Sequence, residues 1–165
     1  YIWDQLSCDS LTASLIVDGF HLPPAVVKAM VRGKTPQHVV LVSDMTGMAG
    51  VVDQDGAEPG LFEQLGLGVV ELLADGRVVV AGQREYLAGA TMPLSVGIAN
   101  IMQFAGVDLA AAIDMASARP AQLLQLECAT LEPGSSADLI QFGMADDGSI
   151  EIVATYHAGE CVWRG

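Results

Sequence analysis

The sequence predicts an α/β fold built on parallel strands. Two apolar runs, 14–21 and 38–44, each end in a polar residue of a type used in catalysis, His21 and Asp44. Runs that are apolar on both faces are typical of strands in a buried parallel sheet, and residues 23–34 between them have helical periodicity. A connection of this length crosses over and returns parallel, so both strands end at the same edge. We therefore expect His21 and Asp44 at the edge where α/β proteins build their active sites.

The helix between these strands has start and stop signals of its own. Pro23 and Pro24 suit a first helical turn, where a missing N–H group removes no hydrogen bond. Gly33 is expected to close the helix, and Pro36 follows three residues later, before the second strand.

The region after Asp44 predicts a loop and then antiparallel strands. Residues 45–50 are too rich in small side chains for a helix, and residues 51–86 have the texture of short strands and turns, with a hairpin turn at 74–77. Gly66 and Gly68 suggest a phosphate-binding loop. Without a third glycine, a Lys-Ser/Thr pair or a following helix, a simple turn is the favoured interpretation.

Helices are predicted in the next part of the chain. One runs from about 93 to 104, and a second covers about 109–118 with Asp108 as its N-cap. A third, short helix follows Pro120.

The last part predicts strands. A turn at 131–136 leads into a strand that ends near Phe142, and two further strands, 150–154 and 156–163, pair around the turn 157–160.

Composition limits the classes of partner. Seven Lys and Arg against twenty Asp and Glu give a net charge of −13, which repels nucleic acid and anionic membrane surfaces. A small phosphorylated substrate remains compatible, because one or two placed cations or a helix N-terminus can bind it. The hydrophobic fraction of 52% predicts that much of the chain is buried, and the start at Tyr1 leads us to expect the tail of a longer protein.

No segment predicts membrane insertion or secretion. The most apolar helical stretch, 92–104, is too short for a span and contains Asn100 and Gln103. No signal peptide is recognisable. Three cysteines at irregular spacing argue against disulfides and against a thiolate zinc site, so we expect buried or half-buried thiols in a cytoplasmic protein.

Several short motifs together resemble the carboxyl-terminal part of the N-acetylglucosamine-6-phosphate deacetylases, a family of the amidohydrolase superfamily. Their order and approximate spacing match over nearly all 165 residues. The matching segments are Asp18-Gly19-Phe20-His21-Leu22, Leu41-Val42-Ser43-Asp44, Leu87-Ala88-Gly89-Ala90-Thr91-Met92, Met115-Ala116-Ser117 with Pro120-Ala121, and Pro133-Gly134 with Ala137-Asp138-Leu139.

The resemblance implies the carboxyl-terminal portion of a (β/α)8 TIM barrel together with strands of a small β-sandwich. The strands ending at His21 and Asp44 would be the last two of the barrel. Residues 1–136 would then belong to the barrel, with a β-rich insertion near 51–86, and residues 137–165 would be the last strands of the sandwich.

The resemblance also implies residue roles in amide hydrolysis, which needs an activated water and a proton for the departing amine. Asp44 matches the family's base and acid beside a divalent metal ion, zinc or iron, of which it is a possible ligand. His21 matches the histidine that contacts substrate near the scissile amide. The remaining matched substrate-binding positions are Asp18, Gly19 and Phe20 beside His21, and Leu87, Ala88 and Gly89 on a further loop.

Each assignment has a structural alternative. Asp44 could cap the turn after its strand, and His21 could be an ordinary strand-end histidine. His38 opens a strand at the opposite edge and is expected to be structural. His157 is expected in a surface turn, with no partner in sequence that would make it a ligand, and Asp138 is expected to be a turn or strand-start residue.

The family's main metal ligands, one glutamate and two histidines, and its phosphate-binding arginine belong to segments upstream of the matched region. We therefore expect these 165 residues alone to bind no catalytic metal tightly and to hydrolyse no substrate. Open strand edges lead us to expect association into a homo-oligomer. Two alternatives stay open: another amidohydrolase that acts on a cyclic amide, and a non-catalytic self-associating module.

Overall fold

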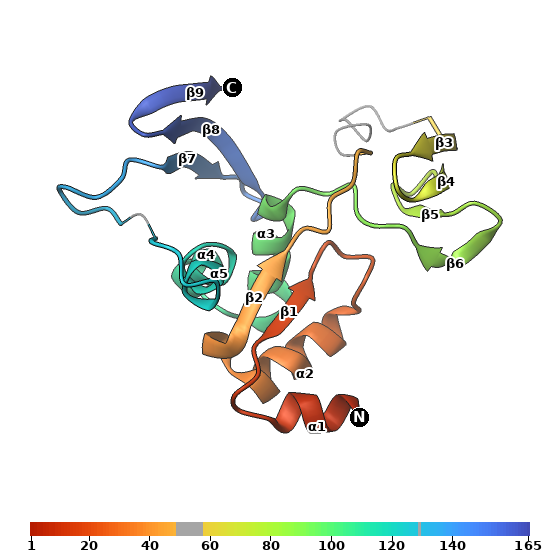
Figure 1. Ribbon diagram of the computed structural model, residues 1–165, viewed down its shortest axis with the longest axis horizontal. Helices are drawn as coiled ribbons and strands as arrows, with labels where there is room; N and C mark the ends of the chain where they lie inside the picture. Colours follow the sequence, from red (N-terminus) through yellow and green to blue (C-terminus); the bar gives the residue numbers. More distant parts are fainter. Residues whose placement is uncertain (49–57, 129) are drawn as a thin grey trace.

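A computed structural model describes residues 1–48, 58–128 and 130–165. The first two strands, β1 (Ala13–Ile16) and β2 (Val39–Val42), pair in parallel, with Ala13 opposite Val39 and Ile16 opposite Val42. The helix α2 (Pro24–Lys34) connects them as predicted (Figure 1). Both strands therefore end at one edge of a two-stranded sheet.

The end of α2 differs from the prediction. Gly33 lies inside the helix, and Thr35, at a φ of 62°, is the residue after its last turn. The helix continues through Lys34 because this side chain is buried and its Nζ donates to the Cys8 carbonyl at 2.5 Å. Cys8 follows α1 (Ile2–Ser7), a helix that the sequence did not predict. Of the three cysteines, Cys8 is half-buried and the other two, contrary to expectation, are exposed.

Helices pack against the parallel strands. The helix α3 (Leu94–Ala105) and the helix α4 (Leu109–Ala116) confirm the predicted pair, and Asp108 caps α4 by accepting from the Ala111 N–H at 2.8 Å. The second helix is shorter than predicted because the backbone breaks at Ser117, so that α5 (Ala118–Leu123) begins before Pro120. The buried cluster shared by these elements is Leu15, Val17, Val27, Val31, Val39, Leu41, Ile98, Ile101, Ala112 and Met115.

A separate four-stranded antiparallel sheet lies between Asp44 and α3 in the sequence. Its strands follow chain order: β3 (Gly60–Gln64), β4 (Gly68–Leu72), β5 (Val78–Val80) and β6 (Gln83–Leu87). This sheet has its own core, made by Met48, Val70, Leu72, Val78 and Ala88. The predicted strand-and-turn texture is confirmed, except that residues 49–57 lie outside the described part of the chain.

Gly66 and Gly68 have φ angles of 84° and 77° in the turn between β3 and β4. A strand follows them, so the turn lacks the helix that a phosphate-binding loop needs.

A third sheet of three antiparallel strands ends the chain: β7 (Leu139–Met144), β8 (Ile150–His157) and β9 (Glu160–Arg164). The two antiparallel sheets stand apart on either side of the β1–β2 layer in Figure 1. A short 3₁₀ helix, η1 (Pro36–His38), precedes β2 and leaves His38 exposed at the edge opposite Asp44. Within the described residues, we find no helix with the length and apolar character that a membrane span requires.

Candidate functional site

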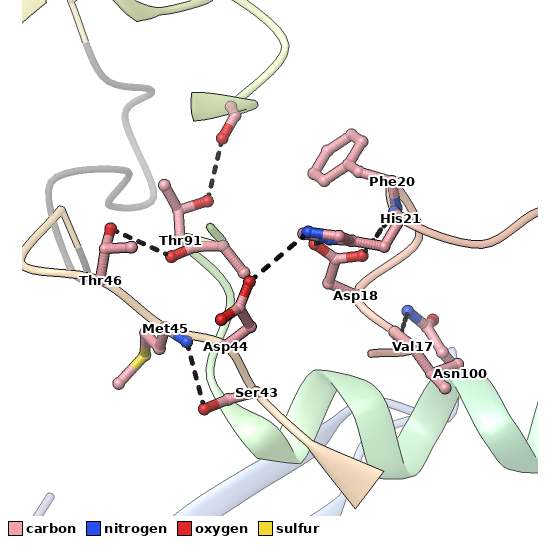
Figure 2. Close-up of polar contacts among 12 residues, drawn as sticks. Val17, Asp18, Phe20, His21, Ser43, Asp44, Met45, Thr46, Thr91 and Asn100 are labelled. Carbon is pink, nitrogen blue, oxygen red and sulfur yellow. Dashed lines mark hydrogen bonds and ion pairs between the residues drawn. The ribbon is translucent and has the colours of Figure 1, made fainter. Parts of the chain in front are cut away.

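His21 and Asp44 come together at the carboxyl edge of β1 and β2. The His21 Nε2 atom lies 3.7 Å from Asp44 Oδ2 (Figure 2). The His21 side chain is 18% exposed and that of Asp44 is 49% exposed, so the pair is open to a molecule from solvent on the Asp44 side. The parallel order of the strands places these two residues together although 23 positions separate them, as the sequence predicted.

Asp18 organises the turn that carries His21. Its Oδ1 atom accepts from the backbone N–H groups of Phe20 and His21, both at 2.9 Å, and its Oδ2 atom lies 2.8 Å from His21 Nδ1. Burial raises the pKa of this carboxyl, but the hydrogen bonds from the two N–H groups and from the imidazole outweigh burial, so the net pKa lies below the ordinary value. Asp18 is therefore ionised near neutral pH and acts only as an acceptor.

Two further residues fix this turn. Gly19 has a φ of 94°, a conformation that side chains other than glycine rarely adopt. Asn100, on α3, donates from Nδ2 to the Val17 carbonyl at 2.9 Å and so ties the end of β1 to the helix. Asn100 belongs to none of the motifs that point to the site in the sequence. A polar amide in an otherwise apolar helix is the signal that could have identified it.

Asp44 lies in an uncommon backbone conformation that a neighbouring segment holds in place. Its φ is 52°, in the left-handed region. The Asp44 carbonyl accepts from the Ala90 N–H at 2.8 Å, and the Thr46 N–H donates to the Ala90 carbonyl at 3.0 Å. Met45 and Ala90 form an isolated parallel bridge at this point. The segment near residue 90 thus supports the backbone that presents the Asp44 carboxylate.

Of the three matched residues on this segment, Gly89 comes closest to Asp44. Its φ is 88°, and a Cβ atom at this position would lie 2.2 Å from Thr46 Cγ2 and 3.1 Å from the Asp44 carbonyl oxygen. Leu87 ends β6, and Ala88 is buried in the core of the four-stranded sheet. Gly89 is therefore required for the close approach of this segment to the site.

The described residues contain no group of three or more His, Cys, Asp and Glu side chains that could hold a metal ion. Asp44 offers a half-exposed carboxylate, whereas the acceptors of Asp18 are used within its own turn.

His157, for which the sequence indicated no ligand partner, contacts Asp138, 19 positions away. The His157 Nδ1 atom lies 2.7 Å from Asp138 Oδ1, which also accepts from the Ala158 N–H at 2.9 Å. Hydrogen bonds from the Ser136 hydroxyl, from the Ala158 N–H and from His157 lower the pKa of Asp138 to about 2. Asp138 lies directly before β7, so its role as a strand-start residue agrees with the prediction.

The fold and the site together describe a mixed α/β protein with an aspartate and a histidine facing each other at the ends of adjacent parallel strands. No protein-family model matches the sequence. The chain is 33% identical over 152 residues to the human N-acetylglucosamine-6-phosphate deacetylase, a match that covers 91% of this chain and 34% of the human protein. It is also 30% identical over 128 residues to a candidate N-acetylgalactosamine-6-phosphate deacetylase of Escherichia coli strain K12, covering 76% of this chain and 70% of that protein.

Solved structures agree with these relatives. The N-acetylglucosamine-6-phosphate deacetylase of Thermotoga maritima superposes with a TM-score of 0.81 at 28% identity, covering 98% of this chain and 41% of that one. An aspartate-to-alanine mutant of the Mycobacterium smegmatis enzyme, in complex with N-acetyl-D-glucosamine-6-phosphate, gives a TM-score of 0.79 at 25% identity, covering 96% and 39%. The chain belongs to the N-acetylglucosamine-6-phosphate deacetylase family. It spans about a third of the length of the human relative and corresponds to the carboxyl-terminal part of these enzymes.

Proposed function

We propose that this chain supplies Asp44 and His21 to the active site of a hydrolase that removes the acetyl group from an N-acetyl amino sugar 6-phosphate. The proposed substrate is N-acetylglucosamine 6-phosphate. The observation that carries the proposal is the 3.7 Å approach of His21 Nε2 to Asp44 Oδ2 at the carboxyl edge of β1 and β2, in a chain of this family. The Mycobacterium smegmatis neighbour, which binds N-acetyl-D-glucosamine-6-phosphate, supports the choice of substrate.

Asp44 is the proton-transferring group in this proposal. Its carboxylate takes a proton from a water molecule as the water oxygen attacks the acetyl carbonyl carbon. When the carbon–nitrogen bond of the tetrahedral intermediate breaks, the same carboxyl returns that proton to the departing amine nitrogen. The products are acetate and the free amino sugar 6-phosphate. The 49% exposure of the Asp44 side chain lets water and substrate reach it.

His21 is the substrate-contacting group, because its Nε2 atom faces the same space as the Asp44 carboxylate. Gly19 and Phe20 are proposed to form the wall of the sugar site beside it, with Asp18 behind them. On the other side of Asp44, Gly89 is proposed to contact substrate together with Leu87 and Ala88.

In the whole enzyme, a divalent metal ion, zinc or iron, would lower the pKa of the attacking water. On the family resemblance, its main ligands, one glutamate and two histidines, would come from segments upstream of the matched region. On the same resemblance, we propose that residues 1–136 form part of a (β/α)8 barrel and that residues 137–165 form part of a β-sandwich. For the 165-residue chain on its own, we propose association into a homo-oligomer, because the open β1–β2 sheet leaves apolar strand edges uncovered.

The proposal is tested with two proteins. The first is the 165-residue chain, assayed for metal content and for acetate release from N-acetylglucosamine 6-phosphate. The second is a chimera in which this chain replaces the matching part of the Thermotoga maritima enzyme. We expect no turnover and no stoichiometric metal in the chain alone, and metal-dependent turnover in the chimera.

A folded, metal-loaded chimera without turnover would contradict the proposed activity. A chimera that hydrolyses a cyclic amide such as a hydantoin in place of the amino sugar would favour another amidohydrolase activity. Turnover by the chain alone, with bound metal, would contradict the proposal that the site needs residues from elsewhere.

A further inference from the structure

The Asp18 carboxylate is committed to its own turn. Its side chain is only 4% exposed, and both of its oxygens have partners within three residues. Oδ1 binds two backbone N–H groups, which fixes the turn, and Oδ2 binds the His21 ring. A carboxylate with so little exposed surface is shielded from a sugar hydroxyl, so its contribution to the site is made through His21.

The His21 ring has two nitrogens, and Asp18 determines which of them carries the proton. An ionised carboxylate only accepts hydrogen bonds, so the 2.8 Å contact requires Nδ1 to be the donor. In the neutral imidazole, Nε2 is then a lone pair that faces Asp44. The 3.7 Å distance to Asp44 Oδ2 is too long for a direct hydrogen bond, and it leaves Nε2 available to a donor placed beside the carboxylate.

A hydrogen bond from helix α3 also holds the backbone next to the Asp18 turn. Asn100 holds the Val17 carbonyl immediately before Asp18, and α3, which carries Asn100, packs against the core of β1 and β2. The Asp18 turn is therefore anchored to a helix at one end and to the imidazole at the other.

We propose that Asp18 is a positioning residue that holds His21 in the Nδ1–H tautomer and directs Nε2 towards Asp44. This inference deepens the proposed function, on which its catalytic meaning rests, whereas the tautomer itself can be measured without any activity. It assigns Asp18 a role behind the reacting groups and not in the wall of the sugar site.

The test is nitrogen NMR of the 165-residue chain with ¹⁵N-labelled histidine, at about pH 8.5, well above the ordinary histidine pKa of about 6.5. A His21→Gln variant assigns the His21 signals. We expect the unsubstituted chain to show Nδ1 protonated and Nε2 unprotonated. In Asp18→Asn, the amide oxygen can still accept from the two backbone N–H groups, but the amide nitrogen donates towards Nδ1, so we expect His21 to change to the Nε2–H tautomer.

Asp108→Asn is the matched control, because Asp108 also accepts a backbone N–H and, within the described part of the chain, makes no hydrogen bond to a histidine. It should leave the His21 signals unchanged. An Nε2–H tautomer in the unsubstituted chain would overturn the inference, even if Asp18→Asn failed to fold. So would a folded Asp18→Asn chain that keeps Nδ1 protonated.

Activity in the chimera gives an independent readout. Asp18→Asn should lower kcat about 100-fold with a smaller change in KM, as expected when a reacting group loses its alignment. If the unsubstituted chimera is inactive while the tautomer result holds, the proposed function fails and the positioning role stands. If the chimera is active and Asp18→Asn keeps its kcat, the positioning role fails and the proposed function stands.

Discussion

Two aspartate–histidine pairs in this chain have almost the same geometry and very different surroundings. Asp18 and His21 meet at 2.8 Å beyond the end of β1, and Asp138 and His157 meet at 2.7 Å where β7 begins and β8 ends. The side chains of the first pair are 4% and 18% exposed, whereas those of the second are 46% and 78% exposed. In the first pair the far nitrogen of the imidazole faces a third group, Asp44.

The difference indicates that a short contact between an aspartate and a histidine is not enough to nominate a pair as a candidate functional site. The Asp138–His157 pair joins residues 19 positions apart and, with the Ala158 N–H, locks a turn of the last sheet. The Asp18–His21 pair is local in sequence, is buried, and points its free nitrogen at a half-exposed carboxylate. Burial and a third partner distinguish an aligned pair from a structural one.

The largest expected difference between the two pairs is in the kcat/KM of chimeras that lack one imidazole or the other. His21→Ala should lower kcat/KM by about 100-fold or more, because it removes a substrate contact beside the reacting bond. His157→Ala should change kcat/KM by less than about twofold, as expected for an exposed ion pair. Acetate release measures kcat/KM of both variants. Equal losses of kcat/KM would contradict the proposal that the Asp18–His21 pair belongs to the active site and the Asp138–His157 pair does not.

A smaller effect is expected on folding. Asp18→Asn should lower the free energy of unfolding of the chain by about 1–3 kcal/mol, because it weakens a buried, charge-assisted hydrogen bond. Asp138→Asn should have a smaller effect, since solvent screens that exposed pair. Urea denaturation followed by circular dichroism measures both, and a larger loss for Asp138→Asn would reverse our interpretation of burial.

The smallest expected effect is on acid stability. The pKa of Asp138 is about 2, below its ordinary value of 3.8, so its contribution to stability is complete above about pH 4 and is lost as the pH falls through about 2. The pKa of Asp18 is also lowered, so its contribution changes in the same direction. Asp138→Asn should therefore flatten the fall in stability between about pH 4 and pH 2. The free energy of unfolding is measured by denaturation at several pH values over that range. If Asp138→Asn leaves its dependence on pH unchanged, the lowered pKa of Asp138 is contradicted.

Local patterns in the sequence predicted much of the fold, and they predicted that His21 and Asp44 lie at the same edge of the β1–β2 sheet. Apolar runs and a helix of crossover length suffice for that, because parallel pairing leaves little choice of edge. Thr35 could not be predicted as the helix end, because the burial of Lys34 against the Cys8 carbonyl decides it. The Asp138–His157 contact depends on how β7 and β8 pair, and local patterns do not specify such a register.

The supports of the site were equally hidden from the sequence. Asn100 reaches the Val17 carbonyl across 83 positions, and the Ala90 N–H reaches the Asp44 carbonyl across 46. Both contacts are tertiary, so no motif contains them. They explain why Asp44 keeps a left-handed backbone conformation and why the Asp18 turn is fixed.

The role of Asp44 in proton transfer is tested most directly by kcat/KM of the chimera carrying Asp44→Asn. The asparagine keeps the size of the side chain but cannot take and return the proton, so we expect a loss of at least about 100-fold in a folded protein. Asp114→Asn, on α4, is the control and should stay within about twofold, because Asp114 is an exposed surface group. An Asp44→Asn chimera that retains the kcat/KM of its parent would contradict the assignment of Asp44 as the proton-transferring residue.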